Sequence, residues 1–128
     1  MYADPDADAY HVRAADESFE IPGRGARAYL DIEAVIAAAR ATDCDALHPG
    51  YGFLAENAAF AAACRAAGLV FIGPSPEAIL AMGDKAGAKA LMQQAGVPCI
   101  PGYQGDDQSE ARLAQEAATI GWPVMIKA

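Results

Sequence analysis

The sequence has few of the residues that metal sites, disulfide frameworks and nucleic-acid surfaces require. Its three cysteines, Cys44, Cys64 and Cys99, are widely spaced and form no CxxC pair. This number and spacing argue against a disulfide framework and a zinc site, and we expect three reduced, mostly buried thiols. Lys and Arg number 9 against 17 Asp and Glu, which gives a net charge of −8. Because such a charge repels polyanions, we expect no nucleic-acid partner and no anionic membrane surface.

Long apolar runs and basic leader segments are also missing. No run approaches the ~20 apolar residues that cross a bilayer, so we expect no membrane span. The first residues, 1–6, hold no basic stretch followed by an apolar one, which argues against an intact secretory signal and favours a cytoplasmic location. What the sequence does have is 54% hydrophobic and 20% charged residues, a balance typical of a globular protein.

Strand and helix patterns alternate along the first part of the chain, which predicts a doubly wound α/β layer with a largely parallel sheet. Asp31 is suited to cap a helix, because apolar residues follow it with the spacing of one helix face. The unbroken apolar run 69–72 predicts a strand covered on both faces. The other predicted strands are 18–21, 46–48 and 124–127, and the other predicted helices are 57–67, 76–82, 85–95 and 110–120.

The alternation changes around residues 74–83, where two helices follow one another without a strand between them. We interpret this change as a boundary between a first domain, residues 1–80, and a second domain, residues 81–128. Within the second, the polar segment 102–109 contains two adjacent carboxylates and predicts a turn that caps the helix after it.

The segment His48-Pro49-Gly50-Tyr51-Gly52 joins a predicted strand to a predicted helix. In open parallel sheets the carboxyl ends of the strands border the ligand crevice, so we expect this loop on the functional edge. Gly50 and Gly52 allow the backbone to approach a ligand closely or to take a positive φ. The alternative is a plain turn in which His48 is hydrogen-bonded to nearby backbone.

Two lysines stand where a positive charge is unfavourable unless an anion is near. Lys85 lies in the first turn of a predicted helix, where a phosphate held by backbone N–H groups would explain it. Lys127 ends an apolar strand, and its ammonium needs water or an anion. The alternatives are a solvated Lys85 paired with Asp84 or Glu77, and a Lys127 that extends into solvent.

Four segments together resemble the biotin carboxylase component of biotin-dependent acyl-CoA carboxylases. They are HPGYGFLAEN at 48–57, FIGPSPEAILAMGDKAGAK at 71–89, AGVPCIPGY at 95–103 and IGWPVMIKA at 120–128. With further matching segments at 2–6 and 11–17, the resemblance covers essentially the whole chain. The residues GYQGDDQS at 102–109 are most similar to the branch that carboxylates 3-methylcrotonyl-CoA or geranyl-CoA.

This resemblance implies an ATP-grasp ligase, with an incomplete doubly wound parallel sheet followed by the start of an ATP-grasp domain. Such enzymes use ATP and Mg²⁺ or Mn²⁺ to activate bicarbonate, and the carboxyl group passes to biotin on a carrier domain. The resemblance implies that Lys85 and Lys127 contact ATP and that Tyr51 and Gly52 face biotin. It also implies an oligomeric complete enzyme that works with a carboxyltransferase subunit.

Parts of the family's pattern are absent from these 128 residues. The family has a strand, a glycine-containing turn and a helix before the segment equivalent to Tyr2, and its glycine-rich loop, metal-binding glutamates and bicarbonate residues after IKA. We therefore expect no catalytic residue and no metal ligand in this chain, no carboxylase activity from it alone, and weak or absent ATP binding. The alternatives are another ATP-grasp ligase, such as a carbamoyl-phosphate synthetase relative, and a non-catalytic α/β fragment that packs on a partner subunit.

Overall fold

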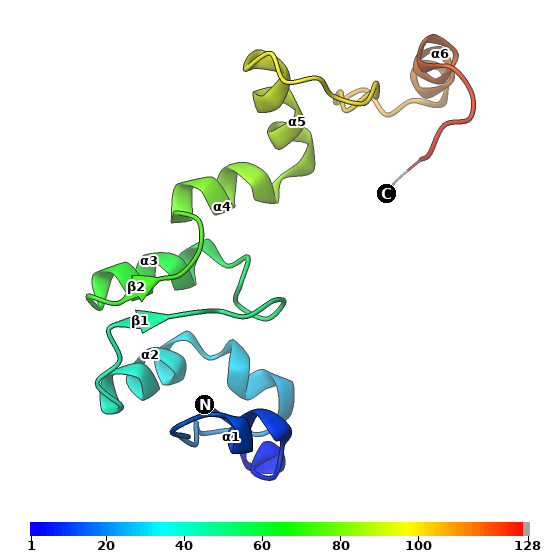
Figure 1. Ribbon diagram of the computed structural model, residues 1–128. Helices are drawn as coiled ribbons and strands as arrows, with labels where there is room; N and C mark the ends of the chain where they lie inside the picture. Colours follow the sequence, from blue (N-terminus) through cyan, green and yellow to red (C-terminus); the bar gives the residue numbers. More distant parts are fainter. Residues whose placement is uncertain (127–128) are drawn as a thin grey trace. The chain divides into compact units, whose positions relative to one another are not determined.

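The chain divides into two units, Met1–Gly83 and Asp84–Ala128, and the structure, a computed structural model, describes residues 1–126 (Figure 1). Parallel strands and helices make up the first unit, and helices joined by extended segments make up the described part of the second. The predicted α/β class is therefore confirmed. No helix within residues 1–126 is long and apolar enough to span a membrane.

A two-stranded parallel sheet forms the framework of the first unit. Strand β1 (Ala46–Leu47) pairs with strand β2 (Val70–Phe71), and helix α3 (Ala58–Ala66) connects them. These three elements form the βαβ arrangement that the alternating pattern predicts. Because a parallel pair needs such a crossover, the carboxyl end of β1 leads directly into the loop that precedes α3.

The predicted strand at 18–21 is reduced to an isolated parallel bridge between Tyr2 and Glu20. The Tyr2 N–H donates to the Phe19 carbonyl at 3.0 Å, and the Ile21 N–H donates to the Tyr2 carbonyl at 2.8 Å. Among the described residues Tyr2 alone pairs with this segment, so the hydrogen-bond ladder ends after one residue. The prediction of a full strand there is wrong.

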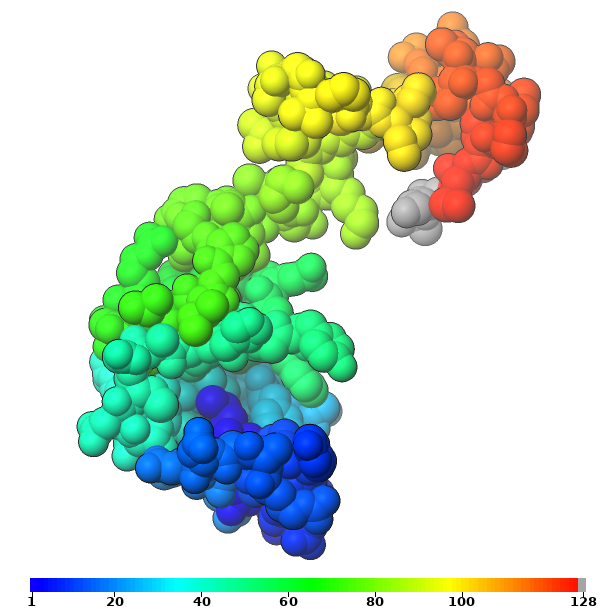
Figure 2. Space-filling view, in the orientation of Figure 1, coloured from blue at the N-terminus to red at the C-terminus, as the bar shows by residue number. Residues whose placement is uncertain are grey.

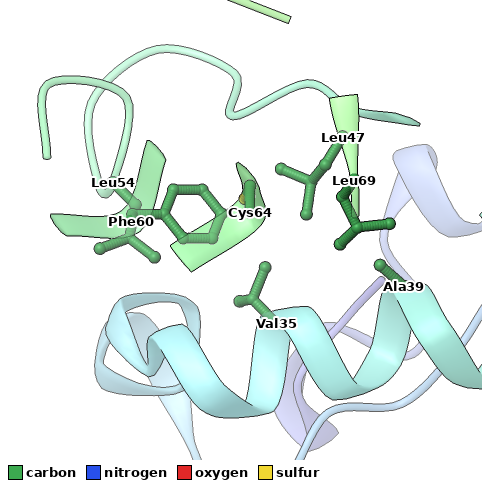
Figure 3. Close-up of a cluster of buried hydrophobic side chains, with 7 residues drawn as sticks. All are labelled: Val35, Ala39, Leu47, Leu54, Phe60, Cys64 and Leu69. Carbon is green, nitrogen blue, oxygen red and sulfur yellow. The ribbon is translucent and has the colours of Figure 1, made fainter. Parts of the chain in front are cut away.

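The larger core lies between helix α2 (Ile32–Ala41), helix α3 and the sheet (Figure 3). Phe60 on α3 is 1% exposed, and its ring meets the Phe71 ring edge-on with centroids 5.8 Å apart. Burial of such large apolar side chains is the main favourable term in folding. The cluster consists of Val35, Ala39, Leu47, Leu54, Phe60, Cys64 and Leu69, with Ile32 and Ile36 packed against it, which confirms the predicted apolar face of α2.

A second, smaller apolar cluster holds the N-terminal segment on the other side of α2. The cluster consists of Ala3, Ile21, Ala28 and Ala38, with Tyr29 packed against it. Ala38 belongs to α2, and the remaining members come from the first thirty residues of the chain. Those residues form only short elements, namely η1 (Asp4–Asp6), α1 (Tyr10–Ala14) and η2 (Gly25–Leu30).

Polar side chains begin the main helices, as the sequence predicts. Helices α4 (Pro76–Gly83) and α5 (Lys85–Gln94) follow one another without a strand between them, and α6 (Glu110–Ile120) ends at Gly121 with φ +92°. Each cap satisfies a backbone donor that the helix itself leaves unpaired. The capping side chains are Asp31, Asn57, Ser75, Asp84 and Ser109.

Three expectations about burial and strands are wrong. Strand β2 is packed on one face only, because Phe71 turns toward the core while Val70 on the opposite face is 62% exposed. Of the three free cysteines only Cys64 is buried; Cys44 lies in the exposed turn after α2, 3.3 Å from the Thr42 hydroxyl. Residues 124–126 are not in a strand, and the rest of that predicted strand lies outside the described residues.

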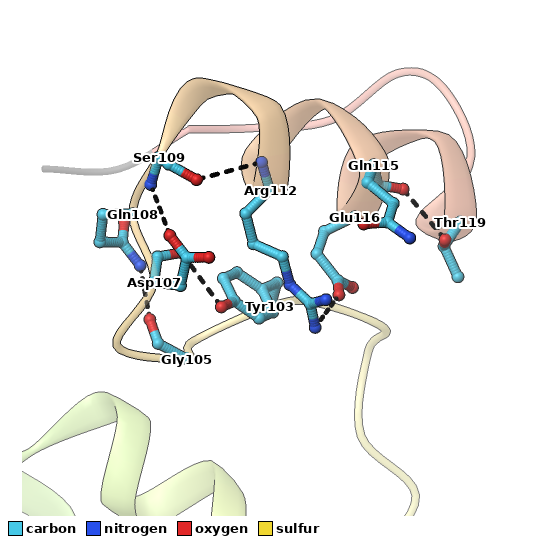
Figure 4. Close-up of polar contacts among 9 residues, drawn as sticks. All are labelled: Tyr103, Gly105, Asp107, Gln108, Ser109, Arg112, Gln115, Glu116 and Thr119. Atoms are coloured by element: carbon cyan, nitrogen blue, oxygen red, sulfur yellow. Dashed lines mark hydrogen bonds and ion pairs between the residues drawn. The ribbon is translucent and has the colours of Figure 1, made fainter.

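The second unit contains little buried apolar surface in its described residues. Ala88 is the one buried residue among them, whereas Ile100 is 86% exposed. Polar contacts instead organise the turn before α6 (Figure 4). The Arg112 guanidinium lies 5.1 Å from the Tyr103 ring centroid and pairs with Glu116 at 2.6 Å, in the segment where the sequence predicts a capped turn.

Candidate functional site

The loop between β1 and α3 lies where the sequence places the functional edge, at the carboxyl end of a parallel strand. Gly50, Gly52 and Phe53 all have positive φ angles, of +69°, +75° and +39°. Two of these positions carry glycine, which takes this conformation without a steric penalty. The atoms of the connection, coloured between cyan and green, project from the first unit (Figure 2).

His48 supports this loop through its own side chain. The Gly50 backbone N–H donates to His48 Nδ1 at 3.0 Å. An imidazole nitrogen accepts a hydrogen bond only when it carries no proton, so this contact requires the tautomer with its proton on Nε2. The alternative in which His48 bonds to nearby backbone therefore describes its local contact correctly.

The other end of the loop rests on an aromatic contact. The Phe53 ring lies 5.4 Å from the Tyr29 ring, and the Tyr29 hydroxyl donates to Asp6 Oδ2 at 2.6 Å. Partial burial and the hydrogen bond to Asp6 raise the pKa of the Tyr29 hydroxyl above its usual value. The sequence patterns did not identify Tyr29 or Asp6, because the two residues are 23 positions apart and no local spacing links them.

Tyr51 and Gly52, the residues implied to face biotin, lie at the tip of the loop. Tyr51 is 95% exposed, and Gly52 has open space where a Cβ would project. The Gly52 carbonyl accepts the Ala55 N–H at 2.8 Å, which fixes the turn while leaving the Tyr51 ring in solvent. A flat ligand could therefore reach both residues without displacing a neighbouring side chain.

A hollow of about 740 Å³ lies beneath the loop within the first unit. Apolar residues such as Leu47, Leu54 and Phe60 form most of its lining, and its titratable groups are Asp6, His11, Tyr29 and His48. Neither lysine nor arginine lines it. Phosphate binding needs cations or several free N–H groups, so a lining without Lys or Arg is a poor match for a nucleotide phosphate.

Lys85 lies at the first position of α5, as predicted, and its side chain is exposed. The Asp84 carboxylate accepts the N–H groups of Ala86 at 3.1 Å and Gly87 at 3.0 Å. In this structure the Asp84 cap occupies these two N–H groups, and the expected phosphate contact at the start of α5 stays a prediction. Lys85 can still contribute its ammonium as a point charge.

The carboxylates nearest to Lys85 in the sequence interact with other groups. Asp84 caps α5, and Glu77 pairs with Arg65 at 3.4 Å. In the part of the chain that the structure describes, no carboxylate lies within salt-bridge distance of the Lys85 ammonium. The alternative of a Lys85 paired with Asp84 or Glu77 is not seen.

Lys127 lies outside the described residues, so its predicted ATP contact stays a prediction. Within residues 1–126 no group of three or more His, Cys, Asp or Glu side chains could hold a metal ion together. These residues therefore do not fit the Mg²⁺ or Mn²⁺ that the resemblance implies. For ATP they offer the exposed side-chain ammonium of Lys85.

Known families and known structures both match this chain. Residues 1–79 match the family described as biotin carboxylase, N-terminal domain, and residues 84–128 match the ATP-binding domain of the carbamoyl-phosphate synthase L chain. The biotin carboxylase domain of a single-chain bacterial carboxylase superimposes with a TM-score of 0.85 at 49% identity. That superposition covers 98% of this chain and 29% of the other.

Two named relatives align over nearly the whole chain. The alpha subunit of mitochondrial methylcrotonoyl-CoA carboxylase from Oryza sativa subsp. japonica is 51% identical over 128 residues, which are 99% of this chain and 17% of that protein. A biotin carboxylase from Allochromatium vinosum is 49% identical over 129 residues, covering 99% of this chain and 29% of the relative. The chain thus spans less than a third of the length of the relatives it matches.

Proposed function

Because the chain belongs to the biotin carboxylase N-terminal domain family, we propose that it forms the N-terminal part of the biotin carboxylase of an acyl-CoA carboxylase. In the whole protein this ligase carboxylates biotin with bicarbonate at the expense of ATP. The observation that carries the proposal is the family match over residues 1–79, which includes the loop at the carboxyl end of β1. The reaction is proposed for the whole protein, since these residues span 17 to 29% of the relatives.

Each unit has a separate role in this proposal. Residues 1–80 form the N-terminal α/β domain and present Tyr51 and Gly52 to biotin, supported by the exposure of Tyr51 at the loop tip. Residues 81–128 begin the ATP-grasp domain, where Lys85 and Lys127 position the nucleotide by neutralising phosphate charge. ATP supplies the activation of bicarbonate, and neither lysine acts as a base.

The acyl-CoA is proposed to be 3-methylcrotonyl-CoA or geranyl-CoA. The segment GYQGDDQS at 102–109 supports this choice, as does the 51% identity to the rice relative named methylcrotonoyl-CoA carboxylase subunit alpha. The relative named only biotin carboxylase is 49% identical, so overall identity does not separate the two groups. The proposed partners are a biotin carrier domain and a carboxyltransferase subunit, with which the complete protein assembles as an oligomer.

The carbamoyl-phosphate synthase alternative has support in the second unit only. Its family matches residues 84–128, whereas residues 1–79 match biotin carboxylase. A single function for the whole chain must account for both segments. Biotin carboxylase does so, because its named structures cover 98% of the chain in one superposition.

A chimera tests the proposal. The 129 matched residues of the Allochromatium vinosum biotin carboxylase are replaced by this chain, and ATP-dependent carboxylation of free biotin is measured. We expect activity within about tenfold of the parent enzyme, since nearly half of these residues are already shared. A chimera that elutes and unfolds like the parent but does not carboxylate biotin would contradict the proposal.

Two lysine variants of the chimera test the nucleotide contact. Lys85→Gln removes the exposed ammonium and is expected to lower kcat/KM for ATP about tenfold, with the KM for biotin unchanged. Lys89→Gln is the matched control, one turn further along the same helix. Equal effects of the two substitutions would show that Lys85 has no specific role.

A further inference from the structure

His48 contacts a loop whose backbone has little other support. Three of the four residues from 50 to 53 have the positive φ angles described above, so this turn forms no regular ladder of hydrogen bonds. Within the described chain its two hydrogen bonds are the Gly50 N–H on His48 Nδ1 and the Ala55 N–H on the Gly52 carbonyl. Only the first of these depends on a side chain.

The position of His48 explains why it can act in this way. It follows directly after β1, whose backbone is held by pairing with β2, so its Cα is anchored by the sheet. Its imidazole then reaches forward over two residues to Gly50. At the far end, the Phe53 ring is held against Tyr29. Tyr51 therefore sits between one point fixed by His48 and another fixed by Phe53.

We infer that His48 is a positioning residue, whose imidazole Nδ1 holds the Gly50–Gly52 turn and thereby orients the exposed Tyr51 ring. The expected effect on biotin binding rests on the proposed function, in which Tyr51 and Gly52 face biotin. His48 touches neither substrate nor the reacting atoms in this role. Its loss loosens the loop tip and weakens biotin binding, while the ATP contacts in the second unit are unaffected.

Two isosteric substitutions separate the role of each ring nitrogen. The Oδ1 atom of Asn occupies the place of His Nδ1 and accepts a hydrogen bond from the residue two positions on. The amide of Gln is one bond further out and corresponds to Nε2. His48→Asn therefore keeps the acceptor for Gly50, and His48→Gln moves it out of reach.

The first test is amide hydrogen exchange at Gly50 in the 128-residue chain, with ¹⁵N NMR of the His48 ring. We expect an Nε2–H tautomer, and Gly50 exchange about fivefold faster in His48→Gln than in the parent or in His48→Asn. Because His48 is exposed, the urea midpoint of all three proteins should be the same. A proton on Nδ1, or equal exchange in the two variants, would overturn the inference.

The second test uses the chimera. We expect His48→Gln to raise the KM for biotin about fivefold at unchanged KM for ATP, and His48→Asn to restore it. Equal biotin KM values for both variants would refute the substrate consequence. If the chimera has no carboxylase activity, the proposed function and the effect of His48 on biotin binding are overturned. If Gly50 exchange still differs between the two variants in that case, the role of His48 in the loop stays established.

Discussion

The Tyr29 hydroxyl donates a 2.6 Å hydrogen bond to the Asp6 carboxylate, and the same oxygen accepts the Ala3 N–H at 3.0 Å. One phenol thus ties two points of the N-terminal segment to the element that precedes α2. Its ring also carries Phe53 of the loop after β1. Tyr29 therefore contacts both the N-terminal segment and the loop of the candidate site.

Replacing Tyr29 with Phe tests this connection. The substitution keeps the ring against Phe53 but leaves the Asp6 carboxylate and the Ala3 N–H without their partner. We expect the free energy of unfolding to fall by about 1 kcal/mol, measured by urea denaturation. Tyr10→Phe is the control, because Tyr10 is largely exposed, and it should change the free energy by less than about 0.5 kcal/mol.

The raised pKa of the Tyr29 hydroxyl predicts that the folded chain loses stability at alkaline pH. Partial burial, followed by the Asp6 hydrogen bond, raises the pKa of Tyr29 above 10.0 in the folded chain. Between the unfolded and the raised value the folded state binds more protons, so its stability falls as the pH rises. We expect the urea midpoint of the parent to decline above about pH 10 more steeply than that of Tyr29→Phe. Parallel pH profiles for the two proteins would contradict this.

Phe60 is the largest fully buried side chain among the described residues. It belongs to the cluster that joins α2, α3 and the sheet (Figure 3). Phe60→Ala should lower the free energy of unfolding by about 3–5 kcal/mol, because it removes the ring and leaves a cavity. Phe19→Ala is the matched control, since that ring is partly exposed, and a cost as large as that of Phe60→Ala would contradict the assigned core.

Local patterns predicted the helices well because their determinants are local. Asp31, Asp84 and Ser109 each cap a helix whose start they mark in the sequence, and the acceptor and donor are two or three residues apart. The strands were harder to predict. A strand exists only where a partner runs beside it. Residues 18–21 alternate polar and apolar side chains and residues 124–126 form an apolar run, but the sequence does not reveal their pairing.

The candidate site was predictable in position but not in its supports. The glycines and the strand end located the loop, and Tyr51 at its tip followed from the resemblance. The aromatic contact at the far end of the loop comes from Tyr29, which is itself held by Asp6, and both residues lie far away in the chain. Beside Lys85, the Asp84 carboxylate accepts two N–H groups at the start of α5, a contact that joins residues only two and three positions apart.

Asp84 is expected to fix the start of α5 and hence the position of Lys85. Asp84→Ala removes two hydrogen bonds and should lower the stability of this helix by about 1 kcal/mol. The sensitive measurement is amide hydrogen exchange at Ala86 and Gly87, which should become faster. Asp84→Asn keeps one amide oxygen as an acceptor, so its exchange rates should lie between those of the parent and those of Asp84→Ala. Unchanged exchange rates in Asp84→Ala would show that the cap does not form in solution.

Asp107 should make the start of α6 sensitive to acid. The Ser109 backbone N–H donates to Asp107 Oδ1 at 3.0 Å and, with smaller contributions from the Ser109 hydroxyl and Arg112, lowers the pKa of this carboxyl below 3.8 (Figure 4). A lowered pKa means that the stabilising contribution is present above the unfolded value and is lost as the pH falls through the folded one. The Ser109 amide shift should therefore titrate with a midpoint below 3.8, and Asp107→Asn should abolish that step. Asp106→Asn, the adjacent control, should leave this titration step of the Ser109 amide unchanged. A Ser109 midpoint at or above 3.8 would show that the Asp107 carboxylate does not accept this N–H in solution.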